Sequence, residues 1–481
     1  MKPLLRVACF AVPCALLVAA SAVSCGGRSS LRTRLRPGAD GGAGGEAGAG
    51  GTTSSTSSTT STTSTTSTTT TTGTGGNGGS VSHPIISGSP GSYMQAETSV
   101  AATADGRVAV AWIDVDMGGN SAMGYAISND DGDSFPPVQV VLSPNGRQSS
   151  DPVLAVDPAG NFYLIWVGYY ISGGGPSDMH FYVSKALAGE TTFGPPVEAG
   201  NPADAALGDK PWIATTSTGG VIATWERDDE SNGPDKGFGL VAARSPDGLT
   251  WQQSVIVNDP TFNVFRNLAY PCTSPLGARI YVAYVAISNQ GYDIRLKYSD
   301  DGGATFSAQE MPVSLPSETV AFDDPTCVTD GQQVWVSYGI MNEPQGQAES
   351  DKSYKIRIAH SADGGSVDWR VDAQDSAAGS YFIHPQMVQE SSGAIDVVYY
   401  TGDFDWDYEG SFRWGRATAP ASGFPPSQVV ERPVTFTQAR GDSAWLGDYT
   451  GLFWQGNKLY TSYVVNTSGV AQIAFARFAT N

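Results

Sequence analysis

Short apolar runs that end in an aromatic residue recur along the chain from residue 83 onward. Seven such runs occur, and successive aromatics stand 54 to 64 residues apart. A turn signal that contains glycine stands just before each run, and a further short apolar run precedes the turn. Two apolar runs separated by such a turn are typical of a β-hairpin. The seven runs end at Trp112, Trp166, Trp225, Tyr284, Tyr338, Tyr399 and Tyr463.

A third strand follows most of these hairpins, as at residues 294–298 and 356–359, and a fourth follows the next turn. Four antiparallel strands repeated at this interval are typical of β-propeller blades, which bury their faces against neighbouring blades. The sequence therefore predicts an all-β, seven-bladed β-propeller over residues 83–481. The last repeat ends after three strands, so we expect residues 83–95 to supply its outer strand and close the ring.

The turn between the third and fourth strands carries the pattern Ser-x-Asp-x-Gly-x-x-aromatic. Residues 128–135 and 299–306 fit this pattern, whereas 245–251 are one residue shorter and 361–369 one residue longer. The Ser and Asp side chains suit bonds to turn amides, and glycine suits a positive φ. These turns resemble the Asp boxes of sialidases and related exported propellers, over roughly residues 90–480. Because sialidase propellers have six blades, a six-bladed ring is the alternative fold.

The first 25 residues read as an export signal. Lys2 and Arg6 precede a short apolar stretch at residues 7–20, and small residues follow up to Cys25. This order is typical of a secretory signal peptide. Its end resembles a bacterial lipobox, in which Cys25 becomes the lipidated first residue of the mature protein, with ordinary signal-peptidase cleavage as the alternative. Gly26 indicates outer-membrane retention, so we expect an envelope lipoprotein that faces the periplasm or the cell surface.

Composition separates a linker from the propeller. Residues 26–82 are dominated by Gly, Ala, Ser and Thr, so almost no large apolar side chains offset the entropy of ordering, and we expect a disordered linker. The chain has 47 acidic and 27 basic residues and a net charge of −20, which disfavours nucleic acid as a partner. The propeller region has no 18-residue apolar span, so we expect it to meet the membrane only through a lipid anchor. We also expect a monomer.

Polar residues gather about fifteen positions before the marker aromatics, where each inner strand begins. One interpretation is that they cap strand entries, with the prolines that often follow fixing the entry angle. The other is that they converge with Lys210 on the axial mouth, because equivalent positions in a ring face one axis. The strongest site candidates are residues 209–212 and 445–452. The entry positions are Glu97, Asp151, Asp209, Tyr270, Asp324, His384 and Asp448.

The resemblance to sialidases implies roles for some of these residues. Sialidases hold a substrate carboxylate with three arginines and use a tyrosine nucleophile, a glutamate that activates it, and an aspartate acid/base. The family's Arg-Ile-Pro motif is absent here, and no arginine occurs between residues 83 and 106, so surface arginines without a shared ligand are the alternative. The implied assignments are an arginine triad of Arg147, Arg266 and Arg440, a nucleophile among Tyr449, Tyr270 and Tyr400, a base at Glu226 or Glu97, and catalytic carboxylates at Asp209 and Asp448.

An acidic and aromatic loop follows the sixth marker. Asp403, Asp405 and Asp407 alternate with aromatic residues that include Trp406. Carboxylates at this spacing suit Ca²⁺, which prefers oxygen ligands, and Trp406 suits stacking on a sugar ring. The alternative is a strand extension with its acids in solvent and its aromatics packed inward.

Cys272 and Cys327 are the only cysteines beyond the signal region. They lie in the inner strands of adjacent blades, and an exported compartment permits a disulfide, with two buried thiols as the alternative.

The leading hypothesis for function is an exported, exo-sialidase-like glycoside hydrolase that acts on extracellular glycans. The alternative is a non-catalytic β-propeller that binds carbohydrate or protein at the cell surface, because a fold does not fix a function. The sequence leaves open whether the protein is catalytic.

Overall fold

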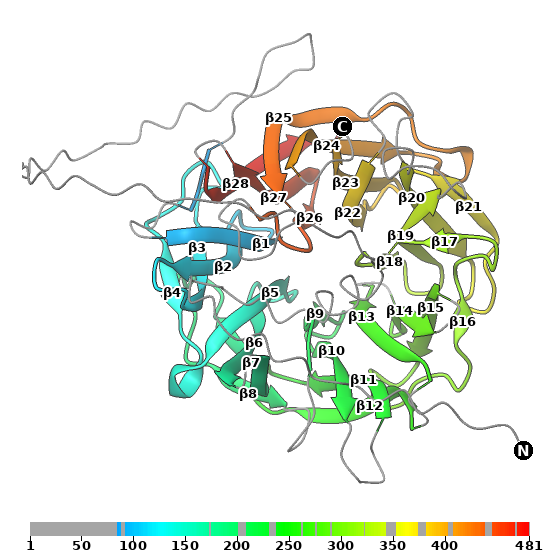
Figure 1. Cartoon of the computed structure of the whole chain (residues 1–481), viewed down its shortest axis with the longest axis horizontal. Coiled ribbons are helices and arrows are strands. Elements are labelled where there is room, and N and C mark those ends of the chain that lie inside the picture. Colours follow the sequence, from blue (N-terminus) through cyan, green and yellow to red (C-terminus); the bar gives the residue numbers. More distant parts are fainter. Residues whose placement is uncertain are drawn as a thin grey trace, which may run out of the picture.

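Seven β-sheets stand in a ring around one axis in the computed structural model (Figure 1). The sheets follow the order of the sequence, which confirms the seven-bladed β-propeller and not the six-bladed alternative. The structure describes residues 84–87, 92–172, 175–200, 208–229, 237–260, 263–274, 277–288, 291–321, 323–342, 353–373, 381–402, 407–437, 445–466 and 469–480. The predicted signal peptide, lipidation site Cys25 and linker lie outside these residues. In the described part, no helix is long and apolar enough to cross a membrane.

Blades 1 to 3 are four-stranded antiparallel sheets. In each, the first strand in the sequence lies nearest the axis and the others follow it outward (Figure 1). Blade 1 contains β1 (Ser92–Ala102), β2 (Val108–Asp116), β3 (Ser121–Ser128) and β4 (Gln139–Val141). Blade 2 contains β5 (Gln148–Val156), β6 (Phe162–Ser172), β7 (Gly175–Ala186) and β8 (Val197–Gly200). Blade 3 contains β9 (Trp212–Thr215), β10 (Val221–Asp229), β11 (Gly237–Ser245) and β12 (Gln252–Asp259).

Blades 4 to 7 continue the ring. Blade 4 contains β13 (Phe265–Cys272), β14 (Ile280–Ser288), β15 (Gly291–Ser299) and β16 (Met311–Pro312). In blade 5, β17 (Thr319–Val320) and β18 (Thr326–Thr329) both pair with β19 (Val334–Asn342), followed by β20 (Ser353–Ser361) and β21 (Trp369–Asp372). Blade 6 contains β22 (Tyr381–Gln389), β23 (Ile395–Gly402), β24 (Asp407–Ala417) and β25 (Gln428–Thr437). Blade 7 contains β26 (Gly451–Gln455), β27 (Lys458–Asn466) and β28 (Ala471–Ala479).

Residues 84–87 lie against β28 and close the ring between the first and last blades. The Ile86 amide donates to the Ile473 carbonyl at 2.9 Å, and the Ile473 amide donates to Ser87 Oγ at 2.7 Å. Ile85 forms an antiparallel bridge with Ala474. The predicted completion of the last blade is therefore confirmed for this segment, and the strand from before the first repeat holds the chain ends together without a covalent bond.

The marker aromatics lie in the second strand of each blade and are fully buried between sheets. Trp112, Trp166 and Trp225 each have an exposed fraction of 0%. The hydrophobic clusters extend from one sheet to the next, as where Ile222 and Leu240 of blade 3 pack with Ile280 and Tyr284 of blade 4. A single blade has too little apolar partner surface of its own, so radial stacking supplies the core.

The Ser-x-Asp turns carry the local bonds expected from their sequence. In residues 299–306 the Gly303 amide donates to Ser299 Oγ at 2.8 Å, and the Thr305 amide donates to Asp301 Oδ1 at 2.8 Å. The turn at residues 128–135 repeats both bonds. Hydrogen bonds from the Thr305 hydroxyl and amide and from Ser299 lower the pKa of Asp301 to about 2. The Asp side chain therefore organises the turn as an ionised carboxylate at neutral pH.

These turns also join neighbouring blades. Gly303 has a φ of +87°, and a Cβ at this position would lie 2.7 Å from Ile222 Cδ1 of the preceding blade. Glycine therefore serves both the turn conformation and the close approach of the two sheets. The equivalent pairs in the other turns are Gly132 with Phe475, Gly248 with Tyr163, and Gly364 with Tyr281.

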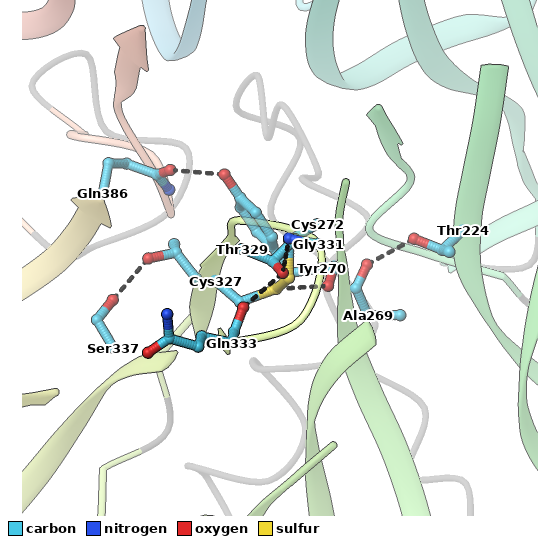
Figure 2. Close-up of a disulfide and its surroundings, with 11 residues drawn as sticks. Thr224, Ala269, Tyr270, Cys272, Cys327, Thr329, Gly331, Gln333, Ser337 and Gln386 are labelled. Atoms are coloured by element: carbon cyan, nitrogen blue, oxygen red, sulfur yellow. Dashed lines mark hydrogen bonds between the residues drawn. A yellow bond between two sulfur atoms is a disulfide. The ribbon is translucent and has the colours of Figure 1, made fainter. Parts of the chain in front are cut away.

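Cys272 and Cys327 form a disulfide with a Cα–Cα distance of 5.7 Å. The bond joins β13 of blade 4 to β18 of blade 5, as Figure 2 shows. This decides between the two alternatives that the sequence left open. The crosslink lies next to Tyr270, whose carbonyl is 3.5 Å from Cys327 Sγ.

Candidate functional site at the propeller axis

Residues with a left-handed backbone conformation recur at equivalent positions in or just before the inner strands. Glu97, Asp151, Lys210, Leu268 and His384 have φ between 48° and 58°, although none of them is glycine. Register shifts flank four of them in β1, β5, β13 and β22. A β-bulge turns its side chain away from the regular alternation of a strand, and a non-glycine residue at positive φ persists only where its surroundings hold it. The ring thus contains a repeated device that redirects side chains of the inner strands.

Three of these positions meet at one buried ammonium. Lys210 Nζ lies 3.1 Å from Glu97 Oε1 and 2.9 Å from Asp448 Oδ2, and it also donates to Asp151 Oδ1. The exposed fractions of these side chains are 1% for Lys210, 0% for Glu97, 1% for Asp151 and 6% for Asp448. One cation from blade 3 therefore joins carboxyl groups from blades 1, 2 and 7. We call these four residues the axial cluster.

The axial cluster has more acids than bases, and this controls its protonation. Burial raises the pKa of Glu97 well above its ordinary value, and the Asp151 and Asp448 carboxylates raise it further, against the opposing effect of Lys210. Burial lowers the pKa of Lys210, but Asp151, Asp448 and Glu97 outweigh it and hold that pKa well above its ordinary value. Glu97 Oε2 is buried and has no hydrogen-bond partner among the described residues. The geometry therefore favours a protonated Glu97 beside a charged Lys210.

Aromatic rings cover one side of the axial cluster. Lys210 Nζ lies 5.6 Å from the centroid of Tyr449, and the Trp212 ring lies 5.1 Å from Tyr449 and 4.4 Å from Tyr270. The Tyr449 hydroxyl donates to the Pro152 carbonyl at 3.0 Å. Burial, followed by nearby carboxylates, raises the pKa of Tyr449, and burial followed by Asp324 raises the pKa of Tyr270. Both phenols therefore hold their protons more firmly than free tyrosine does.

Asp209 and Glu226 lie beside the axial cluster. The Lys210 amide donates to Asp209 Oδ1 at 2.9 Å, and the Glu226 amide donates to the Asp209 carbonyl at 3.1 Å. Asp209 and Glu226 are both buried, at 2% and 5% exposure. Their contacts position the strand entry that carries Lys210.

His384 lies on the opposite side of the ring in blade 6. His384 Nδ1 is 2.9 Å from Asp323 Oδ1, and the His384 amide donates to Asp323 Oδ2 at 2.8 Å. Two residues further on, Gln386 Oε1 accepts from the Tyr270 hydroxyl at 3.4 Å, a contact that spans blades 6 and 4 (Figure 2). The Tyr400 hydroxyl accepts from the Val464 amide at 2.7 Å and thus joins blades 6 and 7.

The two described arginines of the implied triad lie in separate ion pairs. Arg147 pairs with Asp178 and stacks over Tyr170 at 4.7 Å, within blade 2. Arg266 Nη2 lies 2.9 Å from Glu310 Oε1, within blade 4. Arg440 lies outside the described residues. Each described arginine therefore pairs with a carboxylate of its own blade.

The proposed calcium loop falls largely outside the described residues. Asp403, Asp405 and Trp406 are not described, and Asp407 is described only as backbone at the start of β24. In the part of the chain that the structure describes, no group of three or more His, Cys, Asp or Glu residues is arranged to hold a metal ion. Calcium at this loop stays a prediction.

Two hydrogen-bond partners of the entry residues were not predicted from the sequence. Asp323 pairs with His384, although the sequence pattern singled out its neighbour Asp324 at the strand entry. Ser150 donates to Asp151 Oδ2 at 2.7 Å and so extends the axial cluster toward blade 1. The signal for both was their position next to an entry residue, but the spacing rule selects one residue per blade and ignores its neighbours.

Comparisons with known proteins support the fold. No protein-family model matches the chain. No curated protein matches it either. Among solved structures, a PL25 polysaccharide lyase, an ulvan lyase bound to -[GlcA(1-4)Rha3S]-, has a TM-score of 0.52 and 10% identity over 82% of this chain and 96% of that one. At this identity, the likeness shows a shared propeller fold.

Two further structures are more distant in shape. A Hadza microbial sialidase has a TM-score of 0.48 and 13% identity, and it covers 81% of this chain and 66% of that chain. A protein of unknown function from Dyadobacter fermentans has a TM-score of 0.47 and 19% identity over 67% of this chain and 94% of that one.

Proposed function

We propose that this protein is an exported glycoside hydrolase that acts on extracellular glycans and whose chemistry takes place at the axial cluster. The observation that carries the proposal is a buried carboxyl group with a strongly raised pKa, that of Glu97, which shares the Lys210 ammonium with Asp151 and Asp448. Glycosidases commonly need one carboxyl group that holds a proton and another that is ionised. The solved propeller structures described as a sialidase and a polysaccharide lyase also act on glycans.

In this mechanism Glu97 donates its proton to the leaving oxygen as the glycosidic C–O bond breaks. A neighbouring aspartate accepts a proton from the water whose oxygen bonds to the anomeric carbon. Asp448 is the better candidate for this role, because it has the largest exposed fraction in the cluster, at 6%. Lys210 holds the two aspartates in place and counters their charge.

The sialidase form of the proposal depends on the arginines. Arg147, Arg266 and Arg440 would together hold the substrate carboxylate, and Tyr449 or Tyr270 would serve as nucleophile. The raised pKa values of both phenols and the local pairing of Arg147 and Arg266 mean that this form requires rearrangement on binding. Arg266→Ala tests it directly, because loss of an arginine that binds the substrate carboxylate should raise KM for a fluorogenic sialoside.

The test of the wider proposal is hydrolysis of a panel of fluorogenic glycosides, sialosides included, by the native protein and by Glu97→Gln. Glutamine has the shape of a protonated glutamate but cannot transfer its proton, so we expect turnover to fall by about 10²–10⁴-fold. The matched control is Glu198→Gln, since the Glu198 side chain is 43% exposed and pairs with His180 away from the cluster. Equal turnover by the native protein and Glu97→Gln would contradict the assignment of Glu97.

Burial of the axial cluster favours a second candidate, a non-catalytic propeller that binds carbohydrate or protein. Lys210 and Glu97 are at most 1% exposed, so a substrate reaches them only if the covering residues move. On this reading the cluster stabilises the ring and binding takes place at the mouth. Absence of turnover across the glycoside panel, together with measurable glycan binding, would favour this candidate.

A further inference from the structure

Asp396 is an acid at a position that is apolar or aromatic in the other blades. It lies in β23, three residues before Tyr399, the marker aromatic of blade 6, and its exposed fraction is 0%. Burial of a carboxyl group is unfavourable unless its partners compensate, so packing alone does not account for an acid here. The equivalent residues of the other blades are Ala109, Tyr163, Ile222, Tyr281, Trp335 and Tyr460.

Two buried carboxyl groups lie beside one guanidinium. Arg416 of β24 donates from Nε to Glu390 Oε1 at 2.6 Å and from Nη2 to Glu390 Oε2 at 2.8 Å, which makes a bidentate pair. The same Nε lies 4.0 Å from Asp396 Oδ1, beyond hydrogen-bond distance. The Arg416 side chain is 25% exposed and the Glu390 side chain 5%. Arg416 therefore needs only a small displacement to reach a second carboxyl group.

The two oxygens of Asp396 have different surroundings. The Trp414 indole donates to Oδ1 at 2.8 Å, whereas Oδ2 is buried without a hydrogen-bond partner among the described residues. Burial raises the pKa of Asp396 to about 7; the Trp414 hydrogen bond lowers it, the Glu390 carboxylate raises it, and Arg416 lowers it. Hydrogen bonds from Arg416 lower the pKa of Glu390. At acidic pH the cluster is thus a neutral Asp396 beside a Glu390–Arg416 ion pair.

The charges that face Asp396 come from its own blade. The turn after β22 brings Glu390, and β24 brings Arg416. Strand β22 places the apolar Val388 opposite Asp396, and blade 7 contributes the Phe478 ring, which stacks at 5.2 Å on the indole that bonds Asp396. The cations of β27 and β28 pair with Asp131 of blade 1; these are Lys458 and Arg477.

We propose that Arg416 is a pH-dependent switch between two carboxylate partners. At acidic pH, Asp396 keeps its proton and Arg416 pairs with Glu390. When Asp396 releases its proton to solvent, a second carboxylate is buried beside the guanidinium, and Arg416 Nε moves from Glu390 to Asp396. Glu390 then keeps the Ser392 hydroxyl, which donates to Oε2 at 2.8 Å, but the turn at residues 390–394 loses its tie to β24. The pH of the medium thus controls how firmly this turn is held.

Infrared spectroscopy of the full chain tests the titration. At about pH 5 the C=O stretch of a protonated carboxyl group should appear in the native protein and be missing from Asp396→Asn, and the difference should vanish at about pH 9. The matched control is Asp300→Asn, because Asp300 also pairs with an arginine, Arg279, but is 59% exposed, and this variant should retain the band. Glu390→Gln removes the neighbouring negative charge, so the Asp396 band should disappear at lower pH than in the native protein.

Crystal structures of the native protein at the same two pH values test the change of partner. We expect the distance from Arg416 Nε to Asp396 Oδ1 to shorten from 4.0 Å to about 3 Å at the higher pH, while the contact with Glu390 lengthens. A band that persists at about pH 9, no such band at about pH 5, or an Arg416–Glu390 pair that is bidentate at both pH values would each overturn the switch. The native crystals keep the test decisive even if a variant fails to fold.

Discussion

The two sides of the propeller axis are held together by different chemistry. Blades 7, 1, 2 and 3 meet at the single ammonium of Lys210, with three carboxyl groups around it. Blades 4 and 5 are joined by the Cys272–Cys327 disulfide, and blades 5 and 6 by the Asp323–His384 pair. A covalent bond restricts the unfolded chain, whereas a buried ionic cluster must first repay the cost of removing its charges from water.

This difference bears on the proposal that the chemistry takes place at the axial cluster. Because desolvation offsets much of the attraction, a buried cluster with more acids than bases contributes little net stability compared with a well-packed apolar core. The disulfide joins blades 4 and 5 without any titratable group. A small net contribution to stability agrees with the proposal that the carboxyl groups of the axial cluster are reactive.

Removal of the central cation is expected to have the largest effect. Lys210→Met leaves the carboxyl groups of Glu97, Asp151 and Asp448 buried around an apolar side chain, and we expect a loss of about 3–5 kcal/mol in the free energy of unfolding. Urea unfolding measures it, with Lys355→Met as control, since Lys355 is 46% exposed and pairs with Asp372 at the surface. The deficit should shrink in acid as the carboxylates gain protons. A loss no larger than that of the control would mean that the cluster is not a buried ionic network.

Removal of the crosslink is expected to cost less. The double variant Cys272→Ser and Cys327→Ser opens a loop between residues 55 positions apart, and we expect a loss of roughly 2–4 kcal/mol. Unfolding of the native protein with and without reductant measures the same quantity, and reductant should leave the double variant unchanged. Thiol labelling of the unfolded native protein without reductant should find no free thiol at either position. Labelling of both cysteines would contradict the bond.

Two adjacent glycines of one turn test how the blades pack at the perimeter of the ring, away from the axis. Gly302 and Gly303 both have positive φ, but an added Cβ meets nothing within 4 Å at Gly302 and lies 2.7 Å from Ile222 Cδ1 at Gly303. We expect Gly302→Ala to cost about 1 kcal/mol from backbone strain alone and Gly303→Ala to cost about 2–3 kcal/mol, because the contact between blades must also shift. Thermal unfolding of the pair separates the two contributions. Equal losses would show that the turn does not control blade packing.

At low pH the smallest effect is expected from Glu97→Gln, and this effect grows as pH rises. The folded pKa of Glu97 is raised, so the folded state binds more protons than the unfolded state between the two pKa values, and the contribution of Glu97 to stability falls as pH rises. Glutamine removes this dependence. We expect the variant to match the native protein at about pH 5 and to be the more stable of the two at about pH 8. Chemical unfolding at both pH values measures the difference in stability. A variant that becomes less stable relative to the native protein as pH rises would refute a protonated Glu97.

Much of the architecture was predictable because each blade repeats the same local signals. The buried aromatics of the second strands, the glycine turns before them and the Ser-x-Asp turns all act over a few residues, so spacing was enough to count seven blades. The spacing rule also found Glu97, Asp151 and Asp448, and it selected Asp209 next to Lys210, since equivalent residues of a ring face one axis. It could not find that Asp323, and not Asp324, holds His384, because that choice depends on the contact between two blades.

The number of blades, the closing segment and the polar residues at the strand entries could all be predicted from the sequence. The tertiary structure decided their protonation and their partners. Glu97 and Asp448 are 351 positions apart in the chain, yet both lie beside Lys210. Burial at that meeting point raises the pKa of Glu97, and the Asp151 and Asp448 carboxylates raise it further. It likewise decided that Cys272 and Cys327 are bonded, because the distance between two inner strands depends on how adjacent sheets pack.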